Sequence, residues 1–103
     1  DLLITLAASV APFFHEEEYP KEIDGEKMEN YLKWEAIAYG VTLFGGPSIV
    51  IPCGSIGDNL PFGIQIISKK NSDLNLIDIA FSLEQKFKEI NDFTIQPKTS
   101  EFI

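Results

Sequence analysis

Two neighbouring segments are apolar on nearly every side, and this constrains the fold more than any other feature. Met28–Phe44 has a helical pattern that becomes apolar almost all round after Trp34, and Ser48–Ile51 is apolar at consecutive positions. Helices and strands of this kind are covered on most sides. Gly45, Gly46 and Pro47 end the helix, because glycine suits a left-handed stop and the position before proline disfavours helix. Both segments are therefore expected inside an α/β core.

The remaining elements are too few to bury that core. Two further strands and one helix are predicted, over Asp1–Thr5, Phe62–Ser68 and Asp73–Ile90, the helix having its apolar residues at spacings of three and four. A solvated connection is expected over Glu16–Glu35 and a turn-rich loop over Gly54–Pro61. Residues 1–90 thus form part of one domain, and residues 91–103 are predicted to be a tail. The chain starts in mid-strand without Met, so the missing partners are expected in a longer fold.

Composition excludes several classes of function. The 103 residues include 8 Lys+Arg and 16 Asp+Glu, a net charge of −8, which disfavours binding to phosphate backbones and anionic membrane surfaces. At 45 % hydrophobic residues, the chain is too apolar for disorder. A single Cys cannot form an internal disulfide, and one Cys with one His cannot form a structural zinc site. No apolar stretch is long enough to span a bilayer. We expect a cytoplasmic protein without metal or cofactor.

The residue types alone assemble no catalytic constellation. His15 lies between an apolar and an acidic run and is either a general base or a boundary histidine. Cys53 follows a strand between Pro52 and Gly54, as a nucleophile or as an inert buried thiol; no basic neighbour in the sequence lowers its pKa. Glu16–Glu18 form either a cation site or a solvated run. For each of the three we favour the alternative without a chemical role: a boundary histidine, an inert buried thiol and a solvated acidic run.

Two polar residues occur where apolar ones are expected. Glu35 is the only charge between Trp34 and Phe44, so it is either a binding residue or the exposed strip of its helix. Gln65 interrupts an apolar strand, and we expect it to hydrogen-bond a neighbouring loop.

The glycine- and proline-rich motifs resemble a known family. Gly45–Gly54 reads Gly-Gly-Pro-Ser-Ile-Val-Ile-Pro-Cys-Gly, and Leu60–Gln65 reads Leu-Pro-Phe-Gly-Ile-Gln. This pair of motifs closely resembles the C-terminal block of the amidase signature family. Asp1–Thr5 followed by Ala11-Pro12 is similar to the strand that precedes that block. The resemblance covers the chain roughly from Asp1 to Phe87.

The resemblance implies a C-terminal slice of a mixed β-sheet flanked by helices. Family members act on small-molecule amides through an acyl-serine, using a second serine and a lysine. All three lie upstream of this segment, so it contains no catalytic residue. In the branch that amidates misacylated tRNA with glutamine, an Asp on the helix before Gly-x-Pro contacts the substrate's amino group; Glu35 occupies that position here.

Three functions follow from these considerations. The first is part of an amide hydrolase, completing its core and lining its substrate pocket. The second is part of an A-subunit-like protein of a tRNA-dependent glutamine amidotransferase, which predicts a protein partner. The third is a non-catalytic remnant acting as an interaction module. In isolation such a slice is expected to expose the apolar faces of Trp34–Phe44 and Ser48–Ile51, and therefore to oligomerise or aggregate.

Overall fold

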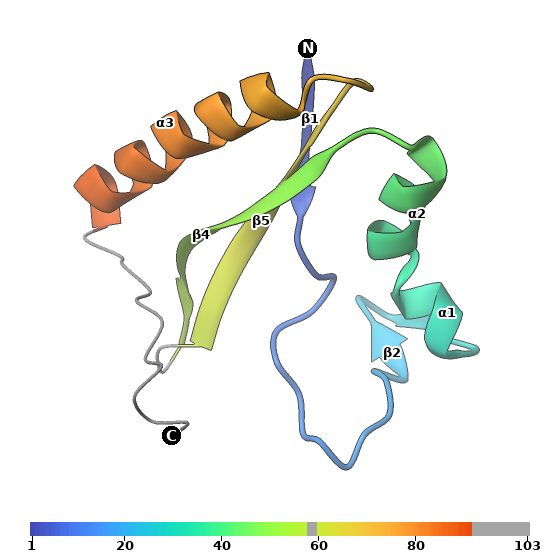
Figure 1. Cartoon of the computed structure of the whole chain (residues 1–103). Helices are drawn as coiled ribbons and strands as arrows, with labels where there is room; N and C mark the ends of the chain where they lie inside the picture. The colour runs from blue at the N-terminus through green and yellow to red at the C-terminus, as the bar shows by residue number, and fades with distance from the viewer. Residues whose placement is uncertain (58–59, 92–103) are drawn as a thin grey trace, which may run out of the picture.

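A three-stranded sheet forms the centre of the protein. The computed structural model describes residues 1–57 and 60–91. The strands are β1 (Leu2–Leu6), β4 (Ser48–Ile56) and β5 (Leu60–Ser68), in the order β1-β5-β4, and both pairings are antiparallel. Helices lie on the two sides of this sheet (Figure 1). The α/β class and the sheet flanked by helices are therefore confirmed.

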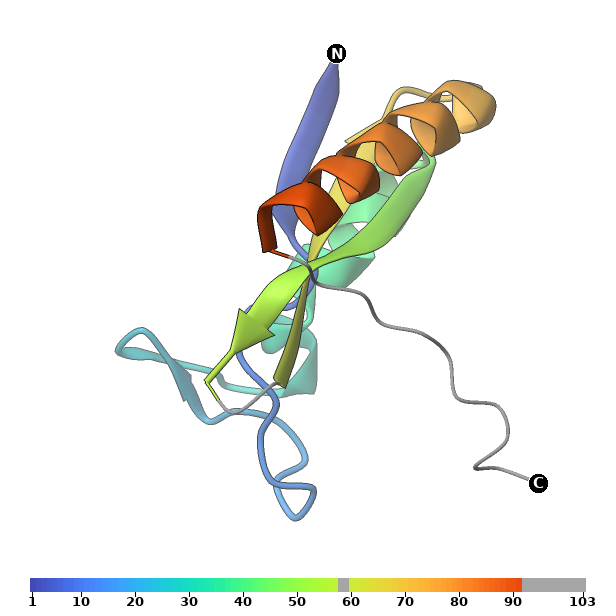
Figure 2. The ribbon, with the colours of Figure 1, turned by 90° about the vertical axis from the view of Figure 1, so that its left-hand side faces the viewer.

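The hydrophobic core lies under the last helix, α3 (Asp73–Asn91), which crosses one face of the sheet (Figure 2). Alternation along β4 and β5 directs every second side chain to this face. The helix contributes residues at spacings of four, three and four, as its sequence pattern predicted. The core consists of Ile51, Ile66, Leu76 and Ala80, with Ile49, Ile64, Leu83 and Phe87 packed against it. The helix predicted over Asp73–Ile90 is confirmed to within one residue.

The other face of the sheet is approached by two short helices. They are α1 (Tyr31–Trp34) and α2 (Ala36–Phe44), and they replace the single helix predicted over Met28–Phe44. The helix is broken at Glu35, whose ψ of 0° departs from helical geometry. Gly45, with φ of 76°, ends α2 in the left-handed conformation that the sequence predicted.

The acidic connection contains a small hairpin that was not predicted. Its strands are β2 (Glu22–Ile23) and β3 (Glu26–Lys27), paired antiparallel. Asp24 and Gly25 join them, both with positive φ (50° and 80°). Asp-Gly favours such turns because both residues tolerate the left-handed region. That dipeptide was the available sequence signal.

Among the described residues of the loop predicted over Gly54–Pro61, most are strand, which corrects the sequence interpretation; positions 58–59 lie outside the described residues. β4 continues to Ile56 and β5 begins at Leu60, so the two strands form a long hairpin. A register shift between Pro52 and Gly54 leaves Cys53 as the extra residue of a bulge. Turn-forming residues thus mark a bulge and a hairpin end here.

Much apolar surface on the described residues is uncovered, as expected for a slice of a larger core. No residue of α2 is buried, and Leu43 is 82 % exposed. On β4, Val50 is 55 % exposed.

Among the helices of the described residues, none is long and apolar enough to cross a membrane. The tail predicted over residues 91–103 lies outside the described residues from position 92 onward.

Candidate functional site

Glu35 lies at the junction between α1 and α2. Its carbonyl oxygen accepts hydrogen bonds from the backbone N–H groups of Ala38 (2.8 Å) and Tyr39 (3.2 Å), which fixes its backbone at the start of α2. Its carboxylate makes no capping hydrogen bond to the helix that follows. The residue is half-buried. Because the Glu35 carboxylate does not cap its own helix, it remains available to another side chain or to a ligand.

The phenol of Tyr31 interacts with this carboxylate. The pKa of Tyr31 is raised above its ordinary value of 10.0, chiefly because the phenol hydrogen-bonds to Glu35 and because the nearby negative charge disfavours the phenolate. The two residues are four positions apart, a spacing that brings side chains together on one turn of helix. Tyr31 and Glu35 therefore form an acid–phenol pair at the end of α1.

A row of aromatic rings supports this pair. Tyr31 packs edge-to-face against Trp34 (ring centroids 5.8 Å apart) and against Tyr19 (6.3 Å). Trp34 in turn packs edge-to-face against Phe13 (5.7 Å). The ammonium group of Lys21 lies 3.5 Å from the centroid of the Tyr19 ring, in a cation–π contact. The row ties the acidic connection and the loop after β1 to helix α1.

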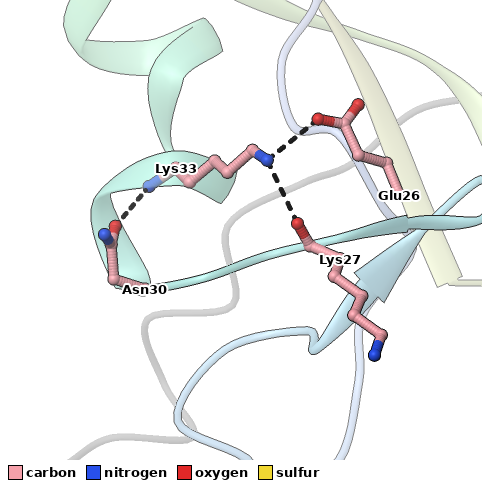
Figure 3. Close-up of polar contacts among 4 residues, drawn as sticks. All are labelled: Glu26, Lys27, Asn30 and Lys33. Carbon is pink, nitrogen blue, oxygen red and sulfur yellow. Dashed lines mark hydrogen bonds and ion pairs between the residues drawn. The ribbon is translucent and has the colours of Figure 1, made fainter.

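The small hairpin is fastened to α1 through Lys33. Its Nζ lies 2.9 Å from Oε1 of Glu26 and donates a hydrogen bond to the Lys27 carbonyl oxygen at 3.1 Å (Figure 3). Asn30 caps α1, since its Oδ1 accepts a hydrogen bond of 3.0 Å from the Lys33 backbone N–H. The contact with Glu26 also raises the pKa of Lys33. These contacts hold the helix that carries Tyr31.

Gln65 links three elements on the α2 side of the sheet. Its Nε2 donates to Thr5 Oγ1 on β1 (3.1 Å) and to the Ile37 carbonyl oxygen on α2 (3.3 Å). Its Oε1 accepts from Ser48 Oγ on β4 (3.1 Å). Only 8 % of Gln65 is exposed. The expected loop partner is therefore wrong, because the amide instead docks α2 onto the sheet.

Two apolar hollows lie beside these elements. One, of about 520 Å³, lies between α2 and β1, and its lining includes Leu3, Thr5, Ile37, Val41, Phe44 and Ile67. The other, of about 270 Å³, lies between the loop after β1 and the hairpin of β4 and β5, and its lining includes Pro12, Phe13, Trp34, Ile56 and Phe62. Trp34 connects the second hollow to Glu35, the next residue in the chain. Glu35 itself lines neither hollow.

The structure also describes the other candidate residues, and Cys53, expected to be buried, is half-buried. His15 is exposed, and its Nε2 lies 3.2 Å from Oε1 of the neighbouring Glu16. Partial burial raises the pKa of the Cys53 thiol, which disfavours the nucleophilic thiolate. Within residues 1–57 and 60–91, no cluster of His, Cys, Asp or Glu could hold a metal ion, so Glu16–Glu18 form no such site there.

Curated relatives align with most of the chain. The A subunit of the glutamyl-tRNA(Gln) amidotransferase from Alkaliphilus metalliredigens is 34 % identical over 93 residues, 87 % of this chain and 18 % of the relative. The same-named protein of Helicobacter hepaticus is 33 % identical over 91 residues, 88 % of this chain and 18 % of the relative. The chain therefore spans less than a fifth of the length of these relatives. No solved structure matches with comparable significance.

A family match covers the elements that build the site. The sequence model of the family described as Amidase matches residues 1–77, which include β1, Glu35, the Pro-Cys-Gly bulge and Gln65. The resemblance drawn from the glycine and proline motifs is thereby confirmed. The chain belongs to the amidase signature family.

Proposed function

We propose that this segment forms one wall of the substrate pocket in an amide hydrolase, with Glu35 contacting the substrate. In the whole protein, a serine outside the segment attacks the amide carbonyl, ammonia or an amine leaves, and water hydrolyses the acyl-serine ester. This segment contributes no group to that step. Its role is to complete the sheet and to position a carboxylate beside the acyl side of the substrate. The proposed location is the cytoplasm, since a chain with one cysteine needs no oxidising compartment.

The geometry of Glu35 carries this proposal. Its backbone is fixed by two hydrogen bonds, the residue is half-buried, and its carboxylate lies close enough to the Tyr31 phenol to raise the pKa of that group. A carboxylate held in this way is pre-organised to bind a substrate amine or amide N–H group, because it need not be ordered on binding. The aromatic row and the Lys33 contacts explain why a short helix of four residues can hold it.

A second candidate function is the A-subunit role in a tRNA-dependent glutamine amidotransferase. The names of the relatives favour it. In this case Glu35 binds the amino group of free glutamine, and further subunits bind the tRNA. The side chain of Glu is one methylene longer than that of Asp, so glutamine would sit farther from the α2 backbone. This difference separates the two functions experimentally.

The test is a chimera in which the segment replaces the matched 93 residues of the A. metalliredigens relative. We expect Glu35→Gln to raise the Michaelis constant about tenfold or more for a substrate that Glu35 contacts, since hydrogen bonds to charged groups contribute about 1.5–3 kcal/mol. The unfolding temperature should change little. Glu29→Gln, an exposed acid just before α1, serves as the control.

The outcomes distinguish the functions. An unchanged Michaelis constant for glutamine and for simple primary amides would rule out Glu35 as a substrate contact. If Glu35→Asp improves the use of glutamine while the parent chimera prefers other amides, the segment belongs to a general amidase. If glutamine is already the preferred substrate, the amidotransferase role is supported. A folded chimera that hydrolyses no amide, while the unmodified relative does, would favour the non-catalytic module.

A further inference from the structure

The break between α1 and α2 needs a cause outside the helix itself. The segment Met28–Phe44 contains no proline, and its one glycine, Gly40, lies five residues beyond the break. Sharp breaks in a helix normally occur at proline, at glycine, or where another group enters the hydrogen-bond ladder. At Glu35 the backbone has φ of −83° and ψ of 0°. The break therefore depends on a contact from elsewhere in the fold.

The hydrogen bonds around Glu35 show where the ladder is interrupted. In a continuous helix, the Ala38 N–H would donate to the Trp34 carbonyl oxygen, four positions earlier. It donates instead to the Glu35 carbonyl oxygen at 2.8 Å, and the Tyr39 N–H donates to the same oxygen at 3.2 Å. The Trp34 carbonyl oxygen thereby loses the donor that a continuous helix would give it.

Ser9 supplies a donor to this carbonyl oxygen. Its hydroxyl, in the loop after β1, donates to the Trp34 carbonyl oxygen at 3.3 Å, across 25 positions of sequence. Both residues are half-buried, and a carbonyl oxygen shielded from water costs free energy when it has no donor. The same loop holds the Trp34 ring through its edge-to-face contact with Phe13. The end of α1 is therefore fixed to this loop at both its backbone and its side chain.

The other side of Glu35 is held by the sheet. Gln65 on β5 donates to the Ile37 carbonyl oxygen at 3.3 Å. Ser9 and Gln65 thus bond to carbonyl groups on either side of Glu35, and they come from two paired strands, since β1 leads into the loop of Ser9 and pairs with β5. The loop orients α1, the sheet orients α2, and Glu35 lies where the two helices meet.

We propose that Ser9 is a positioning residue for Glu35. Its hydroxyl takes the place of the Ala38 N–H at the Trp34 carbonyl oxygen, maintains the break, and so fixes the Glu35 carboxylate relative to the sheet. A continuous helix would instead turn α1, with the Tyr31–Glu35 pair, onto the axis of α2. The consequence for substrate binding rests on the proposed function; the role of Ser9 in the break does not.

The first test identifies hydrogen-bond partners in the unmodified chain by nuclear magnetic resonance. Scalar couplings across hydrogen bonds show which carbonyl group each amide N–H contacts. We expect the Ala38 nitrogen to couple to the Glu35 carbonyl carbon. A coupling to the Trp34 carbonyl carbon would mean that the helix is continuous and would overturn the proposal. Because this measurement needs no variant, it decides the question even where a substitution prevents folding.

The second test is amide hydrogen exchange of Ser9→Ala. The exchange of the Ala38 and Tyr39 N–H groups should become roughly fivefold faster, because one hydrogen bond that holds the junction is lost. Ser9→Thr keeps the hydroxyl and should restore the slower exchange. The Leu76 N–H, which donates to the Ser72 carbonyl oxygen at 2.9 Å in α3, should exchange equally in all variants.

Ser82→Ala is the matched control. It removes a hydroxyl that donates to the Asp78 carbonyl oxygen at 3.1 Å within α3, so it should leave the exchange of Ala38 and Tyr39 unchanged. Equal acceleration at Ala38 in the Ser9→Ala and Ser82→Ala variants would overturn the proposal.

Two further results would also overturn the proposal. One is unchanged exchange at Ala38 in Ser9→Ala, and the other is faster exchange at Ala38 and Leu76 alike, which would show a general loss of stability. Neither test involves a substrate. Selective acceleration at Ala38, together with an unchanged Michaelis constant for Glu35→Gln, would support the role of Ser9 and contradict the proposed function.

Discussion

The two faces of the sheet are built on different principles. On the α3 face, Ile66 is fully buried, and Leu76 and Ala80 are each 2 % exposed, so the face is sealed by apolar packing. On the α2 face, Gln65 donates one hydrogen bond to the Ile37 carbonyl oxygen of α2, and no residue of α2 is buried. The first face carries a packed core where α3 lies on β4 and β5, although Ile4 of β1 stays half-exposed. The second is an open surface fixed in place by polar contacts.

This difference explains why the candidate site lies on the α2 side. Polar contacts have directional geometry, so they can fix α2 without filling the space around it. Apolar packing would instead close the hollows beside α2 and β1. A substrate pocket needs space next to fixed groups. The α2 face offers such space beside Ile37 and Thr5, and Glu35 lies at the start of the same helix, outside the hollows.

The largest expected effect comes from the sealed face. Ile66→Ala should lower the free energy of unfolding by about 2–5 kcal/mol, because it removes a fully buried side chain and leaves a cavity. Leu43→Ala on α2 should change it by less than about 0.5 kcal/mol, because Leu43 is 82 % exposed. Urea unfolding followed by circular dichroism measures both. Similar losses for the two variants would show that the faces do not differ in stability.

An intermediate effect is expected from the polar contacts of Gln65. Gln65→Met keeps the length of the side chain but removes its three hydrogen bonds, leaving the Ile37 carbonyl oxygen without this donor. We expect a loss of about 1–3 kcal/mol and faster proteolysis within α2. Gln85→Met, the same change at a half-buried position of α3, is the control. Equal proteolysis of α2 in the two variants would mean that Gln65 does not dock this helix.

Sequence patterns predicted the sealed face better than the open one. The helical spacing of Leu76, Ala80 and Leu83 located α3 to within one residue, since apolar packing imposes a periodicity that the sequence must carry. Turn-forming residues were harder to interpret. Gly54–Pro61 suggested a loop, but residues 54–56 and 60–61 belong to the paired strands β4 and β5. The turn at Asp24-Gly25 was missed inside an acidic segment.

The candidate site was predicted only in part. Its family, and Glu35 as a candidate substrate contact, came from the motifs around Gly45–Gly54. The break between α1 and α2, which separates Glu35 from its expected place inside one helix, has no signal in the helical pattern. The partners of Gln65 come from three elements up to 60 positions away, and such contacts depend on the tertiary fold. The Tyr31–Glu35 pair follows from the structure as well.

The smallest effect concerns this acid–phenol pair on the open face. Because the Glu35 carboxylate accepts the phenol hydrogen bond and disfavours the phenolate, the pKa of Tyr31 should lie above 10.0, and Glu35→Gln should bring it back toward that value. Glu18→Gln should lower the pKa less, since Glu18 makes only the weakest contribution. Nuclear magnetic resonance of tyrosine labelled at the phenol carbon follows this titration.

The raised pKa of the Tyr31 phenol makes the stability of the folded state depend on pH in one direction. A group whose pKa is raised in the folded state stabilises that state below its unfolded pKa, and the stabilisation is lost as the pH rises through the folded pKa. The Tyr31 contact should thus be intact at neutral pH and break above pH 10.0. Since Tyr31 is 41 % exposed, the change in overall stability should be small. A Tyr31 titration that Glu35→Gln leaves unchanged would separate the two side chains and remove the support that Glu35 receives from α1.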